Sequence, residues 1–403
     1  MILTKKMSKQ TYIYIAFLFI IVLLFKNRVE AEIILSQNGN FLFYNSPIIT
    51  SIKEYSYLSF VDNMGRVQVK KYTNNNFKKP ITSYLVHDYT SNIKAFKNPK
   101  IHNDDHSAPA IIYNPFFKKI TLATSFHGSD LYLYDYSAKE DKFKLSKTIL
   151  GMYTYPRFIK TEKEILLFVR KQYKKNSKWH GSLVFYKSSD NFTKEHLLLD
   201  TYPNSIIYAS RPYYSNNIVY FAYATHDYDT VNMTGLTIIG WSTKSEKIIL
   251  NLDLNNYLDK KYFYNRPTGL AVKENRIIVA TSFFNNKKNF KNEKLYTWTN
   301  TILILEVNIK NKDNIKVKVL HKNRTKAPYY NTDIFIDKNF NWIYFDENKT
   351  VANKQISDEC FHHKYMMYPS IIENSVYYVK VNNEHYSIRD FNNSIIRCQH
   401  YAK

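Results

Sequence analysis

The chain has 403 residues, with 57 Lys and Arg against 34 Asp and Glu, and a formal net charge of +23. Such an excess favours polyanionic partners through long-range attraction, although a Lys- and Asn-rich composition also follows from a genome of low GC content. A nucleic acid is not indicated, because the chain has no nucleic-acid-binding motif and no phosphate-cradling Gly-rich loop. Charge alone therefore does not identify the partner.

Residues 1–31 have the pattern of an export signal. Basic residues precede an unbroken apolar run from Tyr12 to Phe25, and Val29-Glu30-Ala31 offers a small-x-small cleavage site. The run is shorter than the roughly 20 apolar residues of a spanning helix, and the alternative is an uncleaved signal anchor. In both cases we expect residues 32–403 to be secreted or periplasmic, with the membrane reached only through an uncleaved N-terminal segment. Without the five basic residues and one acidic residue of the signal, 52 basic and 33 acidic residues remain, an excess of 19.

Apolar runs of strand length recur along the rest of the chain. They are rich in Ile, Val, Tyr and Phe, they alternate with Asn-, Asp- and Lys-rich turns, and helical periodicity is nearly absent. Examples are YSYLSFVDNMGRVQVKKY, KEILLFVRKQY, NIVYFAYATHD and RIIVATSFFNN. This pattern predicts an all-β chain.

Prolines recur at the start of apolar runs, where the first residue of a strand need not donate a ladder hydrogen bond. They are Pro109, Pro156, Pro212, Pro267 and Pro369. The last interval is about twice the others, and NTDIFID from Asn331 fills the gap without a proline. With an earlier unit near YSYLSFVD the count is seven units of about 53 residues, within the range of four-stranded propeller blades. We predict a seven-bladed β-propeller in one domain, residues 32–403.

Polar residues gather at corresponding strand ends of three units. Adjacent antiparallel strands bring the start of the first and the end of the second to the same end of a sheet. In a ring of such sheets these ends converge on the mouth of the central channel. The residues expected there are His106 and His127 of the second unit, Tyr153, Tyr155 and Arg170 of the third, and Tyr208, Arg211 and His226 of the fourth.

This residue set has no carboxylate pair at matching positions, which argues against ordinary glycoside hydrolysis. It suits β-elimination at a uronic acid. An arginine would pair with the C6 carboxylate and acidify the C5 proton, a neutral His or a tyrosinate would remove that proton, and a Tyr or His would protonate the O4 leaving group. No cofactor is needed for these three roles.

The same residues resemble a known family. DDHSAPAI, FHG, YTYPRF with LLFVR, SSDNF, and YASRPYY with ATHDYDTVN are similar to bacterial neuraminidase-type repeat proteins, which include ulvan lyases and rhamnose-glucuronate lyases. The resemblance covers roughly residues 100–245, the family carries DDHN more often than DDHS, and SSDNFTKE lacks the Gly and Trp of an intact Asp-box. It implies that the catalytic residues are His106, His127, Tyr155, Arg170 and Tyr208.

Structural roles are the alternative for several of these residues. His106 beside Asp105 is also typical of a satisfied turn, and Tyr155 and Tyr208 also fit core packing in a chain with 36 tyrosines. Tyr153, Arg211 and Arg266 are candidate substrate-binding residues. Arg211 and Arg266 share an Arg-Pro context, and either could bind a substrate carboxylate or brace a blade.

The two cysteines lie in two Cys-x-His motifs. On strands, Cys360 with His362 and Cys398 with His400 would each point to one face, and together they form a tetrahedral zinc set. The alternatives are a disulfide, which is natural for two cysteines in an exported protein, and free thiols. The family resemblance also implies an occasional structural zinc, in which His226 could replace one histidine.

The sequence thus predicts an exported, monomeric polysaccharide lyase whose partner is an acidic polysaccharide. A non-catalytic glycan-binding surface propeller is a second hypothesis. A sialidase-like hydrolase is a third, and it is disfavoured because the matched positions supply no cluster of three arginines with a Tyr/Glu pair.

Overall fold

The computed structural model describes fifteen segments of the chain. No helix among the described residues is long and apolar enough to cross a membrane. Residues 1–31, with the predicted signal, lie outside the described part. The described segments are residues 32–42, 44–89, 105–126, 128–176, 178–201, 206–226, 236–257, 263–284, 300–310, 315–325, 334–346, 349–353, 366–372, 375–381 and 393–399.

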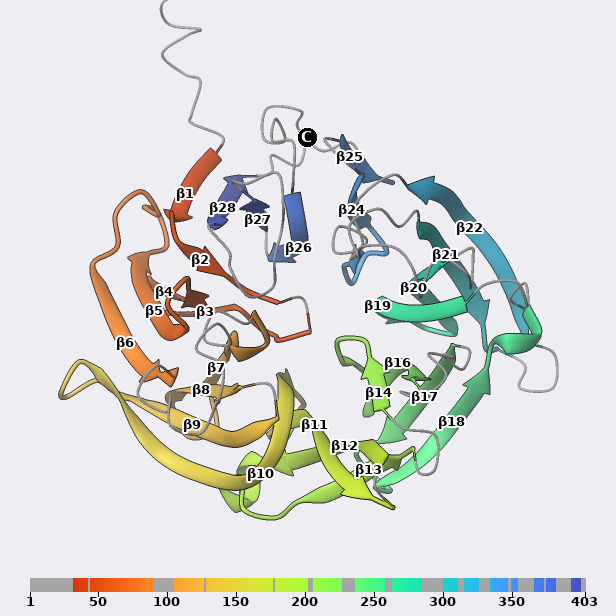
Figure 1. The fold of residues 1–403 in the computed structure, drawn as a ribbon, viewed down its shortest axis with the longest axis horizontal. Coiled ribbons are helices and arrows are strands. Elements are labelled where there is room, and N and C mark those ends of the chain that lie inside the picture. The colour runs from red at the N-terminus through yellow and green to blue at the C-terminus, as the bar shows by residue number, and fades with distance from the viewer. Residues whose placement is uncertain are drawn as a thin grey trace, which may run out of the picture.

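The described strands form six antiparallel sheets that surround a common centre (Figure 1). The first sheet contains β1 (Glu32–Ser36), β28 (Asn393–Gln399), β27 (Ser375–Val381) and β26 (Met366–Ile372). The next contains β2 (Gly39–Asn40), β3 (Ile49–Ile52), β4 (Tyr55–Asp62), β5 (Arg66–Thr73) and β6 (Thr82–Asp88). A seven-stranded sheet follows, with β7 (Ala110–Asn114), β8 (Lys119–Ser125), β9 (Ser129–Ser137), β10 (Lys142–Lys160), β11 (Ile165–Lys175), β12 (Lys178–Lys187) and β13 (His196–Asp200).

Three further sheets complete the ring. They contain β14 (Ile206–Ala209), β15 (Tyr213–Ser215), β16 (Ile218–His226), β17 (Thr237–Ser242) and β18 (Lys247–Asp253); then β19 (Phe263–Lys273), β20 (Arg276–Phe284), β21 (Asn300–Asn308) and β22 (Lys316–Thr325); then β23 (Phe335–Ile336), β24 (Trp342–Asp346) and β25 (Lys349–Ala352). Short 3-10 turns are η3 (Asp105–Ser107), η4 (Ser188–Asp190) and η5 (Asn255–Tyr257). The all-β prediction is confirmed.

The ring closes by pairing the first described strand with the last. β1 runs antiparallel to β28, with Ile34 opposite Ile396, and β2 then begins the neighbouring sheet. One sheet therefore contains strands from both ends of the described chain, and this pairing closes the ring of sheets (Figure 1).

The seven-stranded sheet is really two units joined by the long strand β10. The first part of β10 pairs with β9, from Lys142 to Ile149, and Tyr153 pairs with Ser129. From Thr154 onward the strand pairs with β11 alone. The residues between Thr154 and Lys160 therefore form an inner edge, as β7, β19 and β26 do in their sheets.

The repeating prolines do not all stand at strand starts, which corrects one expectation. Pro109 and Pro212 precede β7 and β15, but Pro156, Pro267 and Pro369 lie inside β10, β19 and β26. Each of these three stands beside or within a register shift of an edge strand. Proline is tolerated there because, at a sheet edge or a bulge, the backbone N–H that proline lacks is not needed for a ladder hydrogen bond. The repeat thus marks bulged inner strands.

The hydrophobic core is divided among the gaps between neighbouring sheets. One cluster joins Tyr57 and Val69 to Ile111 and Leu122, across the sheets of β4 and β8. Others join β12 to β17, β20 to β17, β20 to β24, and β24 to β27. Each sheet therefore buries apolar surface on both faces, which fixes the strand ends that point to the centre.

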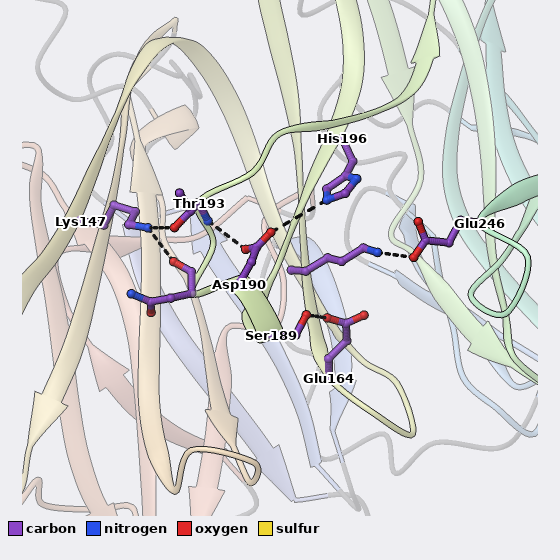
Figure 2. A network of polar contacts seen from close by, with 9 residues as sticks. Lys147, Glu164, Ser189, Asp190, Thr193, His196 and Glu246 are labelled. Carbon is purple, nitrogen blue, oxygen red and sulfur yellow. Dashed lines mark hydrogen bonds and ion pairs between the residues drawn. The ribbon is translucent and has the colours of Figure 1, made fainter.

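The segment 188–195, predicted to be a degenerate Asp-box, forms an ordered turn after β12. Asn191 and Phe192 adopt left-handed φ angles of 56° and 55°, and Asp190 Oδ1 accepts a hydrogen bond of 2.9 Å from the Thr193 N–H. Lys147 Nζ donates to the Asn191 carbonyl and to Thr193 Oγ1. Figure 2 shows this network, which also includes an ion pair between Lys187 and Glu246 of the neighbouring sheet. The turn therefore ties strands together.

Candidate functional site

His106 is held at the inner end of the β7–β8 pair by its surroundings. It lies in η3 and is half-buried. Thr124 Oγ1 on β8 donates 2.9 Å to the carbonyl of Ser107 and also contacts the hydroxyl of Tyr89 at 3.0 Å. Asn45 Nδ2 donates to the carbonyl of Ala108. These bonds fix the backbone on the C-terminal side of His106 and so limit where its imidazole can lie.

Tyr155 owes its position to a β-bulge. The register of β10 against β11 shifts between Thr154 and Arg157, and Tyr155 has a φ of 63°. A bulky residue in the left-handed region is an outlier that costs about 1–3 kcal/mol, and such strain is found at functional sites. In a regular strand Tyr153 and Tyr155 would share a face. The bulge places them in different surroundings: Tyr155 packs with Tyr44 and Ala108, and Tyr153 packs with Val169 and Val184.

Arg170 lies beneath two tyrosine rings. It is 2% exposed, and its Cζ is 4.4 Å from the ring centroid of Tyr155 and 5.1 Å from that of Tyr208. The ring of His106 is 5.3 Å from that of Tyr155. His106 and Tyr208 are half-buried, so they form the more open side of the site and Arg170 its floor. The structure thus brings together residues of η3, β10, β11 and β14 that the sequence predicted to meet.

Two further residues of this cluster were not predicted. Arg157, 1% exposed, donates from Nε to the carbonyl of Tyr44 at 2.8 Å. Its Cζ is 5.4 Å from the ring centroid of Tyr44 and 5.9 Å from that of Tyr155. The Tyr44 ring lies 4.6 Å from that of Tyr155 and 6.1 Å from that of Tyr208. The sequence signal was a cationic residue in the apolar run after Pro156; nothing in FLFYNS singled out Tyr44.

The cluster has a strongly positive interior. The pKa of Arg157 is lowered to about 10, chiefly by burial; Tyr44 and Tyr155 oppose this shift, and the positive charges of Arg170 and Arg211 add to it. Arg157 therefore remains charged at neutral pH. Burying a positive charge is costly, so this arrangement favours an anionic group beside the arginines, such as a carboxylate or a phenolate.

Arg211, a predicted substrate-binding residue, connects several sheets. Its Nη1 donates to Ser370 Oγ on β26 at 3.2 Å, and its Cζ is 5.2 Å from the ring centroid of Phe335 on β23. It is half-buried and close enough to Arg157 to influence its pKa. The position agrees with the bracing alternative and also leaves Arg211 beside the positive cluster.

Tyr153 lies in another environment than the one predicted. Its hydroxyl donates to Glu195 Oε2 at 2.9 Å and accepts from Tyr186 at 2.9 Å, and Lys171 pairs with Glu195 at 2.7 Å. Burial raises the pKa of Tyr153 to about 12. These contacts give Tyr153 a structural role between β10, β12 and the segment before β13.

Several other predicted site residues cannot be placed in the cluster. His127 lies outside the described residues. Arg266 lies in β19, where its backbone is opposite Ser282, and His226 ends β16 opposite Ile206; neither side chain is among those described.

The cysteine motifs are only partly covered by the described residues. Cys398 on β28 is buried and disulfide-bonded. Cys360, His362 and His400 lie outside the described residues, among which no cluster of three or more His, Cys, Asp or Glu could bind a metal. A disulfide sulfur supplies no thiolate, so the state of Cys398 favours the disulfide alternative over the zinc set.

Thiol labelling tests this assignment. The chain has 2 cysteines. We expect a thiol reagent to label neither in denatured, unreduced protein and both after reduction, because an oxidised pair has no reactive thiolate. Labelling before reduction, together with zinc released on denaturation, would instead support the zinc set.

Comparisons with known proteins give a fold but no sequence family. No protein-family model matches the chain, and no curated protein matches it. A polysaccharide lyase of family 25, an ulvan lyase bound to GlcA(1-4)Rha3S, superimposes with a TM-score of 0.60 at 13% identity, covering 90% of this chain and 94% of that chain. A second structure of an ulvan lyase of this family gives a TM-score of 0.59 at 13% identity, with coverage of 90% and 94%. An α-L-arabinofuranosidase from Fusarium graminearum gives 0.43 at 10% identity, with coverage of 72% and 92%.

The likeness to the two ulvan lyase structures shows a shared fold. The described sheets, their arrangement around a centre and these neighbours agree on a propeller-like all-β chain. The resemblance to neuraminidase-type repeats finds no support in a family model and stays a prediction.

Proposed function

We propose that this protein is a polysaccharide lyase that cleaves a uronic-acid-containing polysaccharide by β-elimination. The observation that carries the proposal is that the buried Arg170 guanidinium lies 4.4 Å from the Tyr155 ring centroid and the His106 ring lies 5.3 Å from it. A guanidinium, a phenol and an imidazole, which suit carboxylate binding and proton transfer, thereby lie within one cluster.

Each group has a role in the elimination. Arg170 would pair with the C6 carboxylate, where charge accumulates as C5 loses its proton. The base of the His106 and Tyr155 pair takes the C5 proton, the C4–C5 double bond forms, and the C4–O4 bond breaks. The acid of the pair gives its proton to O4, so that one proton is taken and one returned. His127 is proposed to assist and Tyr208 to position the sugar.

The similarity in fold supports this substrate class. The structural neighbour with a TM-score of 0.60 is an ulvan lyase bound to a sugar that contains GlcA, a uronic acid. The excess of basic residues over acidic ones also favours an acidic polysaccharide as partner. The polymer is thus proposed to be an acidic polysaccharide that contains uronic acid.

A sialidase-like hydrolase is the second candidate, because the structure supplies a group of three arginines that the sequence comparison lacked. The cluster of three arginines that the matched positions lacked is present once Arg157 joins Arg170 and Arg211. Such hydrolases can use a tyrosine nucleophile. That tyrosine needs a carboxylate as its base, however, and the matched positions of the sequence supply no Tyr/Glu pair. A glycan-binding propeller without turnover is the third candidate.

The propeller is proposed to have seven blades and to be exported. Dividing the seven-stranded sheet at β10 turns the six sheets into seven units. Seven hydrophobic clusters then correspond to the seven gaps between neighbouring units, including the gap across the β1–β28 closure. Export follows from the signal pattern of residues 1–31 and is tested by N-terminal sequencing of the mature protein.

The experiment that tests the activity is a screen of acidic polysaccharides for new ultraviolet absorbance. Elimination leaves a 4,5-unsaturated uronate at each new non-reducing end, and its conjugated double bond absorbs in the ultraviolet. We expect absorbance to rise with at least one glucuronate- or iduronate-containing polymer and not with neutral glucans. Binding without absorbance or chain shortening would favour the glycan-binding candidate.

A further inference from the structure

Two buried guanidinium groups lie close to the ring of Tyr155. Arg170 approaches its ring at 4.4 Å and Arg157 at 5.9 Å, measured from Cζ to the ring centroid. The other titratable groups around the ring are Tyr44, at 4.6 Å between centroids, and His106, at 5.3 Å. Arg170 also contacts the Tyr208 ring, at 5.1 Å, and the charge of Arg211 acts on Arg157. Two of the groups in contact with the Tyr155 ring are therefore guanidinium groups.

Arg157 is tied to the backbone that holds Tyr155 in place. Its Nε donates to the Tyr44 carbonyl at 2.8 Å, and its own backbone forms a parallel bridge with Ser46. The Ser46 N–H donates to the carbonyl of Pro156 at 3.3 Å, and the N–H of Phe158 donates to the Ser46 carbonyl at 2.7 Å. The bulge that carries Tyr155 is thus clamped to the segment before β3.

Packing alone does not account for a charged residue at this position. Arg157 is 1% exposed, and its Nη1 has no hydrogen-bond partner among the described residues. An apolar side chain of similar length would fill the same space without the cost of burying a charge. The guanidinium lies 5.9 Å from the ring centroid of Tyr155, where its positive charge acts on that phenol.

We propose that Arg157 is a positioning residue for Tyr155, which it holds in the bulge and whose phenolate form it stabilises with a second positive charge. An opposite charge nearby favours the ionised form of an acid and lowers its pKa. Tyr155 then exchanges its proton more readily in either role, taking one from C5 as phenolate or giving one to O4 as phenol. The effect on ionisation concerns the protein alone, and its catalytic consequence rests on the proposed function.

The test places 3-fluorotyrosine at position 155 of the full chain and follows its fluorine resonance against pH without any substrate. In Arg157→Met we expect the midpoint to rise by about one unit or more. In Arg157→Lys, which keeps the charge but loses the planar fork, the rise should be smaller. The same label with Arg276→Met serves as control, because Arg276 is an exposed residue paired with Glu306.

Thermal unfolding of the same variants separates a functional charge from a structural one. If the proposal holds, the midpoint of the label rises in Arg157→Met whether or not Tm falls through loss of the Nε hydrogen bond to the Tyr44 carbonyl. A lower Tm with an unmoved midpoint would show a purely structural arginine and overturn the proposal. Should Arg157→Met fail to fold, an unmoved midpoint in folded Arg157→Lys overturns it equally.

The outcomes also distinguish this inference from the proposed function. A shifted midpoint in a protein that yields no unsaturated product leaves the inference standing and removes the lyase assignment. Unsaturated product together with an unmoved midpoint leaves the lyase assignment standing and overturns the inference about Arg157. If both hold, the pKa in the pH profile of kcat should move in Arg157→Lys in the same direction as the midpoint of the label.

Discussion

Replacing Tyr155 with Phe is expected to lower kcat by about 10²–10⁴ on any polysaccharide that the protein cleaves. The substitution removes only the hydroxyl, so the ring that contacts Arg170 and Tyr44 remains in place. Proton transfer through Oη is lost while packing is kept, and KM should change little. The measurement is steady-state kinetics by ultraviolet absorbance.

Tyr186→Phe is the matched control for this loss. Tyr186 is also a buried tyrosine, and its hydroxyl is within hydrogen-bond distance of the Tyr153 hydroxyl at 2.9 Å and of Glu195 Oε2 at 2.8 Å. Its loss should lower stability by about 1 kcal/mol and leave kcat unchanged, because these bonds are structural. If Tyr155→Phe kept normal turnover, Tyr155 would have no part in proton transfer.

Arg170→Lys is expected to lower kcat by about 10²–10³ although the positive charge is kept. A guanidinium offers a planar fork that binds a carboxylate bidentately, whereas an ammonium acts as a point charge. The contact strengthens as the carboxylate gains charge during C5 deprotonation, so the loss should fall on turnover more than on KM. Kinetics over a range of substrate concentrations separates the two constants.

Arg276→Lys is the control for this substitution, since Arg276 forms a surface ion pair with Glu306 at 2.8 Å. It should leave both constants unchanged. A rise in KM with kcat preserved in Arg170→Lys would mean that Arg170 binds substrate and transition state equally, and its proposed role in elimination would then be wrong.

The strand content and the meeting of His106, Tyr155, Arg170 and Tyr208 could be predicted from the sequence. Apolar runs separated by turn residues fix the strands, and antiparallel pairing fixes which strand ends lie together. Thr154 opposite Arg170 and Ala110 opposite Ala123 follow that rule. These relations depend only on neighbouring segments of chain.

The bulge at Tyr155 could not be predicted, and the errors follow from it. The matching of strand ends placed Tyr153 with Tyr155 at the channel mouth, whereas the register shift leaves Tyr153 in a different cluster. The same shift, with a bridge to Ser46 more than 100 residues earlier, brings Arg157 and Tyr44 into the site. Contacts at such separation along the chain leave no local pattern.

The most direct test of the central claim is cleavage of a substrate polysaccharide in water enriched with oxygen-18. Elimination breaks the C4–O4 bond without adding water, so mass spectrometry should show unsaturated products that carry no oxygen-18 from the cleavage step. Prompt borohydride reduction of each sample stops exchange of the reducing-end oxygen with water, and an oligosaccharide incubated in the same water without the protein corrects for the exchange that precedes it. One oxygen-18 atom per cleaved bond, with saturated ends, would show hydrolysis and contradict the account.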